Sequence, residues 1–345
     1  MLRRKQLSAS PAHQLNPCRA GGLIILLLAI LAPGLQMKAQ GPKMKPAFSL
    51  PFVDHDGYII VSLDFNKAGP KFFLVDTGVT DTVLDSGFAE QMKLDTHEEK
   101  RLKATGGFSH DVIPTRVVDK GVIHRKGLSF ARGPYPVFDM SGFSQFFEID
   151  LAGILGYPLF GKYVVEINYD TKSLDFFKPK KFKYQGAGQI FQLKGSRKLI
   201  IDAGLTLNSC QQVSVPLFLD TGSNDSLQLD KTAQQKYGLP GKQPLHPNGE
   251  GTIVMGGPEG TEVEPSSKAG KIKSLQLGSY ALPDVETVFA ERDTITEDSV
   301  WTDGDLGVDV LSQFNIIVNK PNGSLILEPR KPMATNQPQT CVPLN

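Results

Sequence analysis

The chain has 345 residues, with 37 Lys and Arg against 36 Asp and Glu, and a formal net charge of +1. This length is sufficient for two domains of ordinary size, each with its own hydrophobic core. Because neither sign of charge dominates, the composition argues against nucleic acid or an anionic membrane surface as a partner.

The N-terminal residues have the pattern of an export signal. A basic start is followed by an apolar stretch at residues 21–35 and by Ala39, a small residue suited to cleavage. The stretch is short for a bilayer-spanning helix and typical of a secretory signal peptide. We predict a signal peptide at residues 1–39, a linker at residues 40–46 and a periplasmic or secreted protein. An uncleaved membrane anchor is the alternative.

The next elements form a hairpin that ends in an acid. Apolar residues at 58–65 and 71–75 flank a polar turn, which is the pattern of two paired strands. The second strand runs directly into Asp76-Thr77-Gly78. A short helix is predicted to follow at residues 86–94, with Asp85 or Ser86 as its N-cap.

The second half of the chain repeats this order of parts. Strands are predicted at residues 199–207 and 213–219, and the latter runs into Asp220-Thr221-Gly222. A helix is predicted at residues 231–237, which Asp230 caps and Gly238 ends. Internal repetition of this kind indicates a duplicated module.

Each copy closes with a glycine-terminated segment and two short strands. The segments are Ala152 to Gly156 and Asp303 to Gly307. Helical patterns are scarce throughout, so we predict an all-β chain. The closing strands are predicted at residues 163–167 and 173–176 in the first copy and at residues 314–318 and 324–327 in the second.

The doubled Asp-Thr-Gly, with Ile154-Leu155-Gly156 and Asp305-Leu306-Gly307 after it, resembles the aspartic peptidases. In that family each lobe contributes one Asp-Thr-Gly loop, and a hydrophobic–hydrophobic–Gly element crosses beside it. The short lobes look more like retropepsin-type lobes than pepsin lobes, and the resemblance covers about residues 47–330. It implies two pseudo-symmetric acid-protease β-barrel lobes with a cleft between them. The implied divisions are an N-terminal lobe at residues 47–183, a C-terminal lobe at residues 184–332 and a C-terminal tail at residues 333–345.

The resemblance implies that Asp76 and Asp220 form a catalytic dyad. Two carboxyl groups about 3 Å apart cannot both ionise, so they share a proton and supply both a base and an acid. The threonine hydroxyls are expected to bond across to the opposite loop, and the glycines to let the backbone turn sharply. The supporting residues implied are Thr77, Gly78, Thr221, Gly222 and Ser223.

Two positions depart from the family pattern. Val79 stands where related loops carry serine or alanine, so it cannot donate a hydrogen bond to Asp76, whereas the second loop has Ser223. We expect the missing bond to raise the dyad's pKa and to give a mildly acidic to near-neutral optimum. Asp305 is an acid where the crossing element is normally apolar. It is either a third active-site carboxylate or a strand-edge residue, and we favour the strand edge.

Several other features leave alternatives open. Residues 104–108 and 253–257 contain paired glycines and are either mobile flaps or plain surface hairpins. The basic run at residues 178–183 is expected to be a solvated linker. Cys210 and Cys341 form a disulfide or remain free thiols.

These features together predict an aspartic endopeptidase that hydrolyses peptide bonds with a water molecule activated between two carboxyl groups. The expected partner is a peptide or protein substrate in extended conformation, bound by a monomer without cofactor, metal or nucleic acid. The alternative is a catalytically inactive peptide-binding protein that retains the same fold.

Overall fold

The computed structural model describes residues 44–102, 112–195, 197–241, 244–247, 252–255, 261–264, 267–291, 293 and 302–333. The expected signal peptide and nearly all of the expected C-terminal tail lie outside these residues. The described residues belong to one compact unit that begins at Gln40. None of their helices has the length and apolarity needed to cross a membrane.

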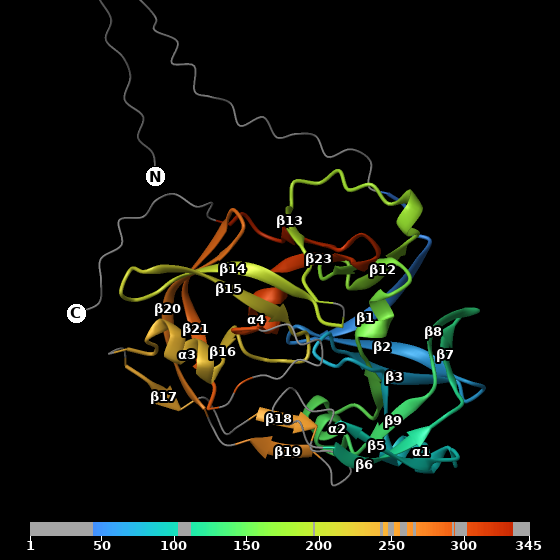
Figure 1. Ribbon diagram of the computed structural model, residues 1–345. Coiled ribbons are helices and arrows are strands. Elements are labelled where there is room, and N and C mark those ends of the chain that lie inside the picture. The colour runs from blue at the N-terminus through green and yellow to red at the C-terminus, as the bar shows by residue number, and fades with distance from the viewer. Residues whose placement is uncertain are drawn as a thin grey trace, which may run out of the picture. The chain divides into compact units, whose positions relative to one another are not determined.

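Strands make up most of the first half of the chain, which we define as residues 44–183 (Figure 1). Its helical segments are α1 (Ser86–Gln91), α2 (Ser141–Phe147), η1 (Tyr157–Phe160) and η2 (Pro179–Lys181). Its strands are β1 (Phe48–His55), β2 (Tyr58–Phe65), β3 (Pro70–Val75), β4 (Val83–Asp85), β5 (His97–Leu102), β6 (Val112–Val118), β7 (Val122–Arg125), β8 (Leu128–Arg132), β9 (Tyr135–Phe138), β10 (Leu151–Leu155), β11 (Val164–Asn168) and β12 (Ser173–Phe177).

The second half, residues 184–333, is built in the same way. Its helical segments are α3 (Lys231–Tyr237), α4 (Val308–Leu311) and η4 (Lys320–Asn322). Its strands are β13 (Gln189–Gln192), β14 (Ile200–Thr206), β15 (Gln212–Leu219), β16 (Leu227–Leu229), β17 (His246–Pro247), β18 (Thr252–Met255), β19 (Thr261–Glu264), β20 (Lys268–Leu277), β21 (Tyr280–Phe289), β22 (Gly304–Leu306), β23 (Phe314–Asn319) and β24 (Ser324–Pro329).

The duplication read from the sequence is visible in the strand pairing. In the first half β2 and β3 form a hairpin, and β10 lies parallel to β3 and antiparallel to β4. In the second half β14 and β15 form a hairpin, and β22 lies parallel to β15 and antiparallel to β16. The same four-strand arrangement therefore holds the end of β3 and the end of β15.

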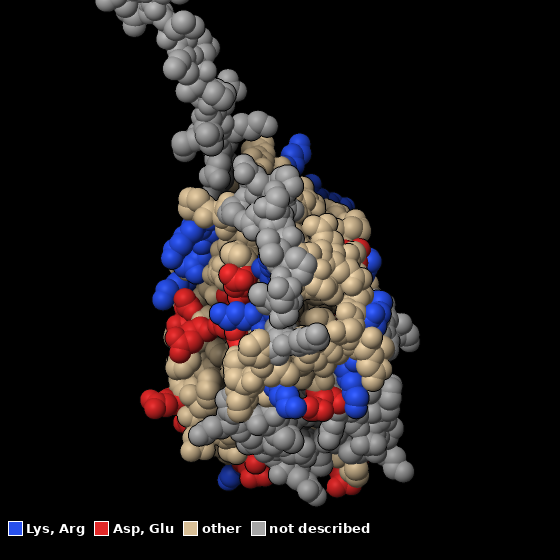
Figure 2. Space-filling view, turned by 90° about the vertical axis from the view of Figure 1, so that its left-hand side faces the viewer, with Lys and Arg blue, Asp and Glu red and all other residues tan. Residues whose placement is uncertain are grey.

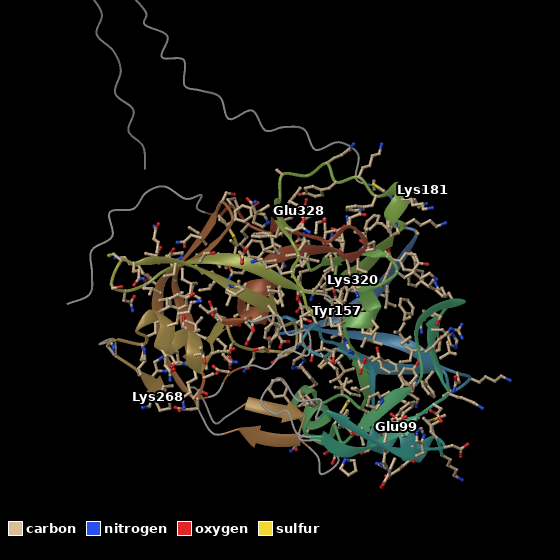
Figure 3. The ribbon with its side chains drawn as sticks, viewed as in Figure 1. Glu99, Tyr157, Lys181, Lys268, Lys320 and Glu328 are labelled. Atoms are coloured by element: carbon tan, nitrogen blue, oxygen red, sulfur yellow. The ribbon has the colours of Figure 1, made fainter. Side chains whose placement is uncertain are left out.

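A continuous sheet joins the two halves. Strand β11 pairs antiparallel with β23, with Val165 opposite Val318 and Ile167 opposite Ile316. The order of strands across the junction is β13-β24-β23-β11-β12-β1. Beside it, the Lys320 ammonium lies 3.9 Å from the centroid of the Tyr157 ring (Figure 3). Each half therefore supplies the hydrogen-bond partners for a strand of the other half that would otherwise be an unpaired edge.

Strand β2 is buried on both faces, because different clusters cover each face. Val61 and Leu63 join the main hydrophobic core, which includes residues from both halves. Tyr58 and Ile60 belong to a second cluster that Phe147 of α2 also enters. The apolar run in β2 follows from this double coverage, since a strand with one solvated face would alternate with polar residues.

The predicted strands and turns are confirmed, and the helix content was underestimated. The two hairpins lie where expected, within about one residue at their ends. Helix α1 ends at Gln91 rather than residue 94, and α3 has the expected bounds. A short helix follows each Asp-Thr-Gly loop as predicted, and the sequence pattern did not indicate the additional helices α2 and α4.

The surface carries both signs of charge, as the balanced composition predicts. Acidic and basic side chains are interspersed on the face shown in Figure 2. The basic run before residue 184 is exposed at Lys178, Lys180, Lys181 and Lys183, in agreement with a solvated connection.

Candidate active site

The two Asp-Thr-Gly segments are held in place by matching backbone bonds. Asp76 follows β3 and its N–H donates to Leu155 O at 3.1 Å, at the end of β10. Asp220 follows β15 and its N–H donates to Leu306 O at 2.9 Å, at the end of β22. The crossing strand in each half thus fixes the position of the acid, as the resemblance leads one to expect.

The structure brings the two acids together. The carboxyl groups of Asp76 and Asp220 interact directly, and each lies against the glycine of the opposite loop. Within each loop a backbone N–H also faces the carboxylate, with Gly78 N 2.6 Å from Asp76 Oδ1 and Gly222 N 2.8 Å from Asp220 Oδ1. Two acids from separate halves of the chain therefore form one pair, in which Asp76 is buried and Asp220 is partly buried.

Burial raises the pKa of the Asp76 carboxyl well above its ordinary value, and the charge and hydrogen bond of Asp220 raise it further. The Gly78 N–H and the ammonium of Lys198 act in the opposite direction. The balance favours a proton on the pair over a wider pH range than for an isolated aspartate. Because the groups are coupled, this proton belongs to the pair and not to one acid.

Thr77 and Thr221 connect the two loops through buried, reciprocal hydrogen bonds. The Thr77 hydroxyl donates to Leu219 O at 2.6 Å and accepts from Thr221 N at 3.0 Å. The Thr221 hydroxyl donates to Val75 O at 3.0 Å and accepts from Thr77 N at 3.1 Å. Each threonine is thus bonded to the strand end and the loop of the other half, in the role expected from the sequence.

Positions 78 and 222 require glycine because the aspartate of the opposite loop lies directly against each of them. A methyl group on Gly78 would lie 2.3 Å from Asp220 Oδ2, and one on Gly222 would lie 2.3 Å from Asp76 Oδ2. Each glycine faces the acid of the other half. Any larger residue would push the two carboxyl groups apart.

Val79 and Ser223, the equivalent residues of the two loops, make different contacts. Val79 packs its side chain against the second hydrophobic cluster. The Ser223 hydroxyl accepts a hydrogen bond from Asp225 N at 3.3 Å, within its own loop. Burial and Asp220 raise the pKa of Asp76, and the contribution of the missing hydroxyl at residue 79 stays a prediction.

Asp305 lies in an interior strand, so the strand-edge interpretation was wrong. Strand β22 lies between β15 and β16, and Asp305 is only 3 % exposed. Burial raises the pKa of its carboxyl well above the ordinary value, the charges of Asp220, Asp225 and Asp230 raise it further, and Lys198 lowers it. Asp305 is therefore electrostatically linked to the dyad.

Two further residues near the dyad were not identified from the sequence. Tyr58 opens β2, and burial raises the pKa of its hydroxyl, with the charge of Asp220 as the next cause. Its ring packs edge-on against Phe147 at 5.0 Å and Phe146 at 6.0 Å. Lys198 lies two residues before β14, and its Nζ donates to the carbonyl oxygen of Gly78. Neither residue belongs to a motif, so only the fold could reveal its position.

One of the two proposed flaps is partly described. Residues 253–255 form part of β18, which pairs with β19 as a separate two-stranded sheet, and β19 contacts α2 of the first half. The other proposed flap, residues 104–108, lies outside the described residues, between the paired strands β5 and β6. Antiparallel strand pairs therefore lie at or beside both segments that the sequence indicates.

Metal and disulfide chemistry were also considered. Among the described residues there is no group of three or more His, Cys, Asp and Glu side chains placed to hold a metal ion. Cys210 is disulfide-bonded, in agreement with the first of the two alternatives for this cysteine. Its partner lies outside the part of the chain that the structure describes.

Comparison of the chain with known proteins adds no assignment to this geometry. No model of a known protein family matches the sequence. No curated protein is significantly similar to it.

Proposed function

We propose that the protein is an aspartic endopeptidase with Asp76 and Asp220 as its catalytic dyad and two acid-protease lobes as its fold. The observation that carries the proposal is the close approach of the two loops, in which each carboxyl group lies against the glycine of the opposite loop and the two acids interact directly. They come from loops related by the internal repeat, and threonine hydroxyls tie the loops together. A proton shared between two adjacent acids is the arrangement that metal-independent peptide hydrolysis requires.

The chemistry follows from the shared proton. The ionised carboxylate of the pair removes a proton from a water molecule, which attacks the peptide carbonyl carbon. The protonated carboxyl donates its proton to the carbonyl oxygen, giving a tetrahedral intermediate. Transfer of a proton to the amide nitrogen then lets the C–N bond break. Buried surroundings strengthen each of these electrostatic interactions.

The proposed substrate is an extended peptide that lies in a cleft between the lobes. A peptide in this conformation pairs its backbone with strand edges, and the β18–β19 hairpin offers such edges. One chain supplies both acids, so a monomer is sufficient for catalysis. The N-terminal signal pattern supports an exported, periplasmic or secreted enzyme.

Hydrolysis of casein and of a peptide library across a range of pH tests the proposal. Asp76→Asn and Asp220→Asn should each abolish hydrolysis while the chain remains folded. Asp202→Asn is the matched control, because Asp202 is an exposed acid paired with Lys194 at 2.6 Å. Peptide binding without hydrolysis by the wild-type protein would instead favour the inactive peptide-binding alternative. Hydrolysis that survives both dyad substitutions would overturn the assignment of the site.

A further inference from the structure

Lys198 and Tyr58 occupy the same position in the two halves of the chain. In the first hairpin Ile60 pairs with Leu74, two residues before Asp76. In the second hairpin Ile200 pairs with Phe218, two residues before Asp220. Counting back two residues from each isoleucine gives Tyr58 in one half and Lys198 in the other. The repeat thus places a phenol on one side of the dyad and an ammonium on the other.

A second position differs in a complementary way. Leu155 and Leu306 are equivalent, since each accepts the N–H of a dyad aspartate. The residue before each is Ile154 in the first half and Asp305 in the second. Tyr58 and Ile154 belong to one hydrophobic cluster. The second half therefore replaces both members of an apolar pair with groups of opposite charge.

The Lys198 ammonium lies at the boundary between the halves. The residue is 5 % exposed. Its Nζ donates to Gly78 O in the first catalytic loop and lies 4.7 Å from the centroid of the Phe218 ring. A buried ammonium is costly unless negative charge compensates it. The acids that its charge affects are Asp76 and Asp305.

Asp305 is also incompletely satisfied by hydrogen bonds. Its Oδ2 accepts from Gln228 Nε2 at 3.1 Å. Its Oδ1 is buried and has no hydrogen-bond partner within the described part of the chain. A carboxyl group with a free buried oxygen is much more easily accommodated when neutral than when ionised. The negative charge that offsets Lys198 is therefore carried by the dyad.

We propose that Lys198 is a positioning residue that holds the first catalytic loop and stabilises the singly ionised dyad by its charge. The inference rests on the proposed function, because it assigns a role within that site. The dyad in this state has one negative charge, which the buried ammonium neutralises. The other charged or titratable groups on the surrounding elements are Tyr58, Asp81, Arg197, Asp225, Asp230, Asp305 and Asp309.

The pH dependence of kcat/KM tests this role. Lys198→Met keeps an unbranched side chain but removes the charge, so the acidic limb should move to higher pH by on the order of one unit. Lys198→Arg keeps the charge and should restore the wild-type limb. Lys236→Met is the matched control, because Lys236 pairs with Asp303 in the same half and its loss should leave the limb unchanged. A Lys198→Met profile that overlays the wild type, or that loses rate without moving, would overturn the inference.

Where Lys198→Met folds poorly, Lys198→Met/Asp305→Asn removes the ammonium and also replaces the neighbouring buried acid with an amide. The shift of the acidic limb should persist in this double variant, since the ammonium is still absent.

A readout independent of turnover separates this inference from the proposed function. Carbon-13 NMR of aspartate carboxyl groups, assigned with Asp76→Asn and Asp220→Asn, follows the titration of the dyad directly. A dyad titration that moves upward in Lys198→Met would support the role of Lys198 even in a protein without peptidase activity. Active enzyme with an unchanged dyad titration in this variant would reject the role of Lys198 and leave the proposed function standing.

Discussion

Gly78 and Gly222 are the residues at which each half of the chain meets the acid of the other. The distance of 2.3 Å from a methyl group on Gly78 to Asp220 Oδ2 is far below a van der Waals contact. The backbone at this point is fixed by bonds from Thr77 and Thr221, so the loop cannot easily move away. The dyad is therefore sensitive to the smallest possible increase in side-chain size.

Gly78→Ala should lower kcat/KM by on the order of 100-fold, because a displacement of about 1 Å is enough to spoil a catalytic geometry. Gly161→Ala is the matched control, since the nearest atom to a methyl group there is Pro158 O at 3.3 Å. Steady-state kinetics on one peptide substrate would compare the two variants. Unchanged kcat/KM in Gly78→Ala would mean that the carboxyl groups do not need to meet.

Asp305 gives a prediction about stability and pH. The pKa of its carboxyl is raised in the folded chain, while an unfolded aspartate titrates near about 3.9. The folded state then binds a proton that the unfolded state releases, so the native state loses stability as pH rises through this interval. Asp305→Asn removes that loss and keeps an acceptor for Gln228.

The variant should therefore be more stable than the wild type at neutral pH, and the difference should disappear as the pH falls toward about 4. Urea unfolding at a series of pH values measures this difference in the free energy of unfolding. Asp202→Asn, at an exposed ion pair, should change stability by less than about 0.5 kcal/mol. If the gain in stability from Asp305→Asn were largest at low pH, it would contradict a raised pKa for Asp305.

At the scale of elements, Asp85 connects the two helices of the first half. Its Oδ2 accepts from Phe88 N at 2.7 Å, which caps α1. Its Oδ1 accepts from Met140 N at 2.9 Å, immediately before α2. Helix α2 has no side-chain cap of its own at Met140, so the Asp85 carboxylate links the starts of the two helices.

Asp85→Ala should lower the free energy of unfolding by about 1–3 kcal/mol, because it removes a helix cap and leaves a second N–H unpaired. Asp139→Ala is the control, since Asp139 is bonded only to Ser141 N, in an exposed position, and its loss should cost less than about 1 kcal/mol. Equal losses in the two variants, measured by urea unfolding, would show that the link between α1 and α2 contributes nothing.

The elements that could be predicted from the sequence are those with local signals. Strands β2, β3, β14 and β15 are apolar runs bounded by turn residues, and α3 lies between Asp230 and a glycine with φ of +67°. Helix α2 was missed because it spans only seven residues and has no local side-chain cap, although Phe143, Phe146 and Phe147 have the i, i+3, i+4 spacing of a helix. Lys198 was missed because an isolated lysine before a strand is normally exposed, and its burial depends on the opposite half.

At the scale of the whole molecule, the pairing of the halves could not be read from the sequence at all. Val165 and Val318 look like ordinary strand residues, and nothing local specifies that they face each other. The join has two parts, the β11–β23 pairing and the threonine bonds between the two Asp-Thr-Gly loops. Both parts are made of buried hydrogen bonds, and the main core also includes residues from both halves.

This arrangement predicts that the covalent link between the halves is dispensable once the chain has folded. A protease site inserted after Gln185, in the exposed segment before β13, leaves β13 attached to β24 in the second fragment. After cleavage the two fragments should still elute together in size-exclusion chromatography and retain peptide hydrolysis, because separation would expose β11 and β23 as unpaired edges. Uncleaved protein with the same insertion is the control. Fragments that separate without denaturant would mean that each half is stable alone and that the shared sheet does not hold the dyad together.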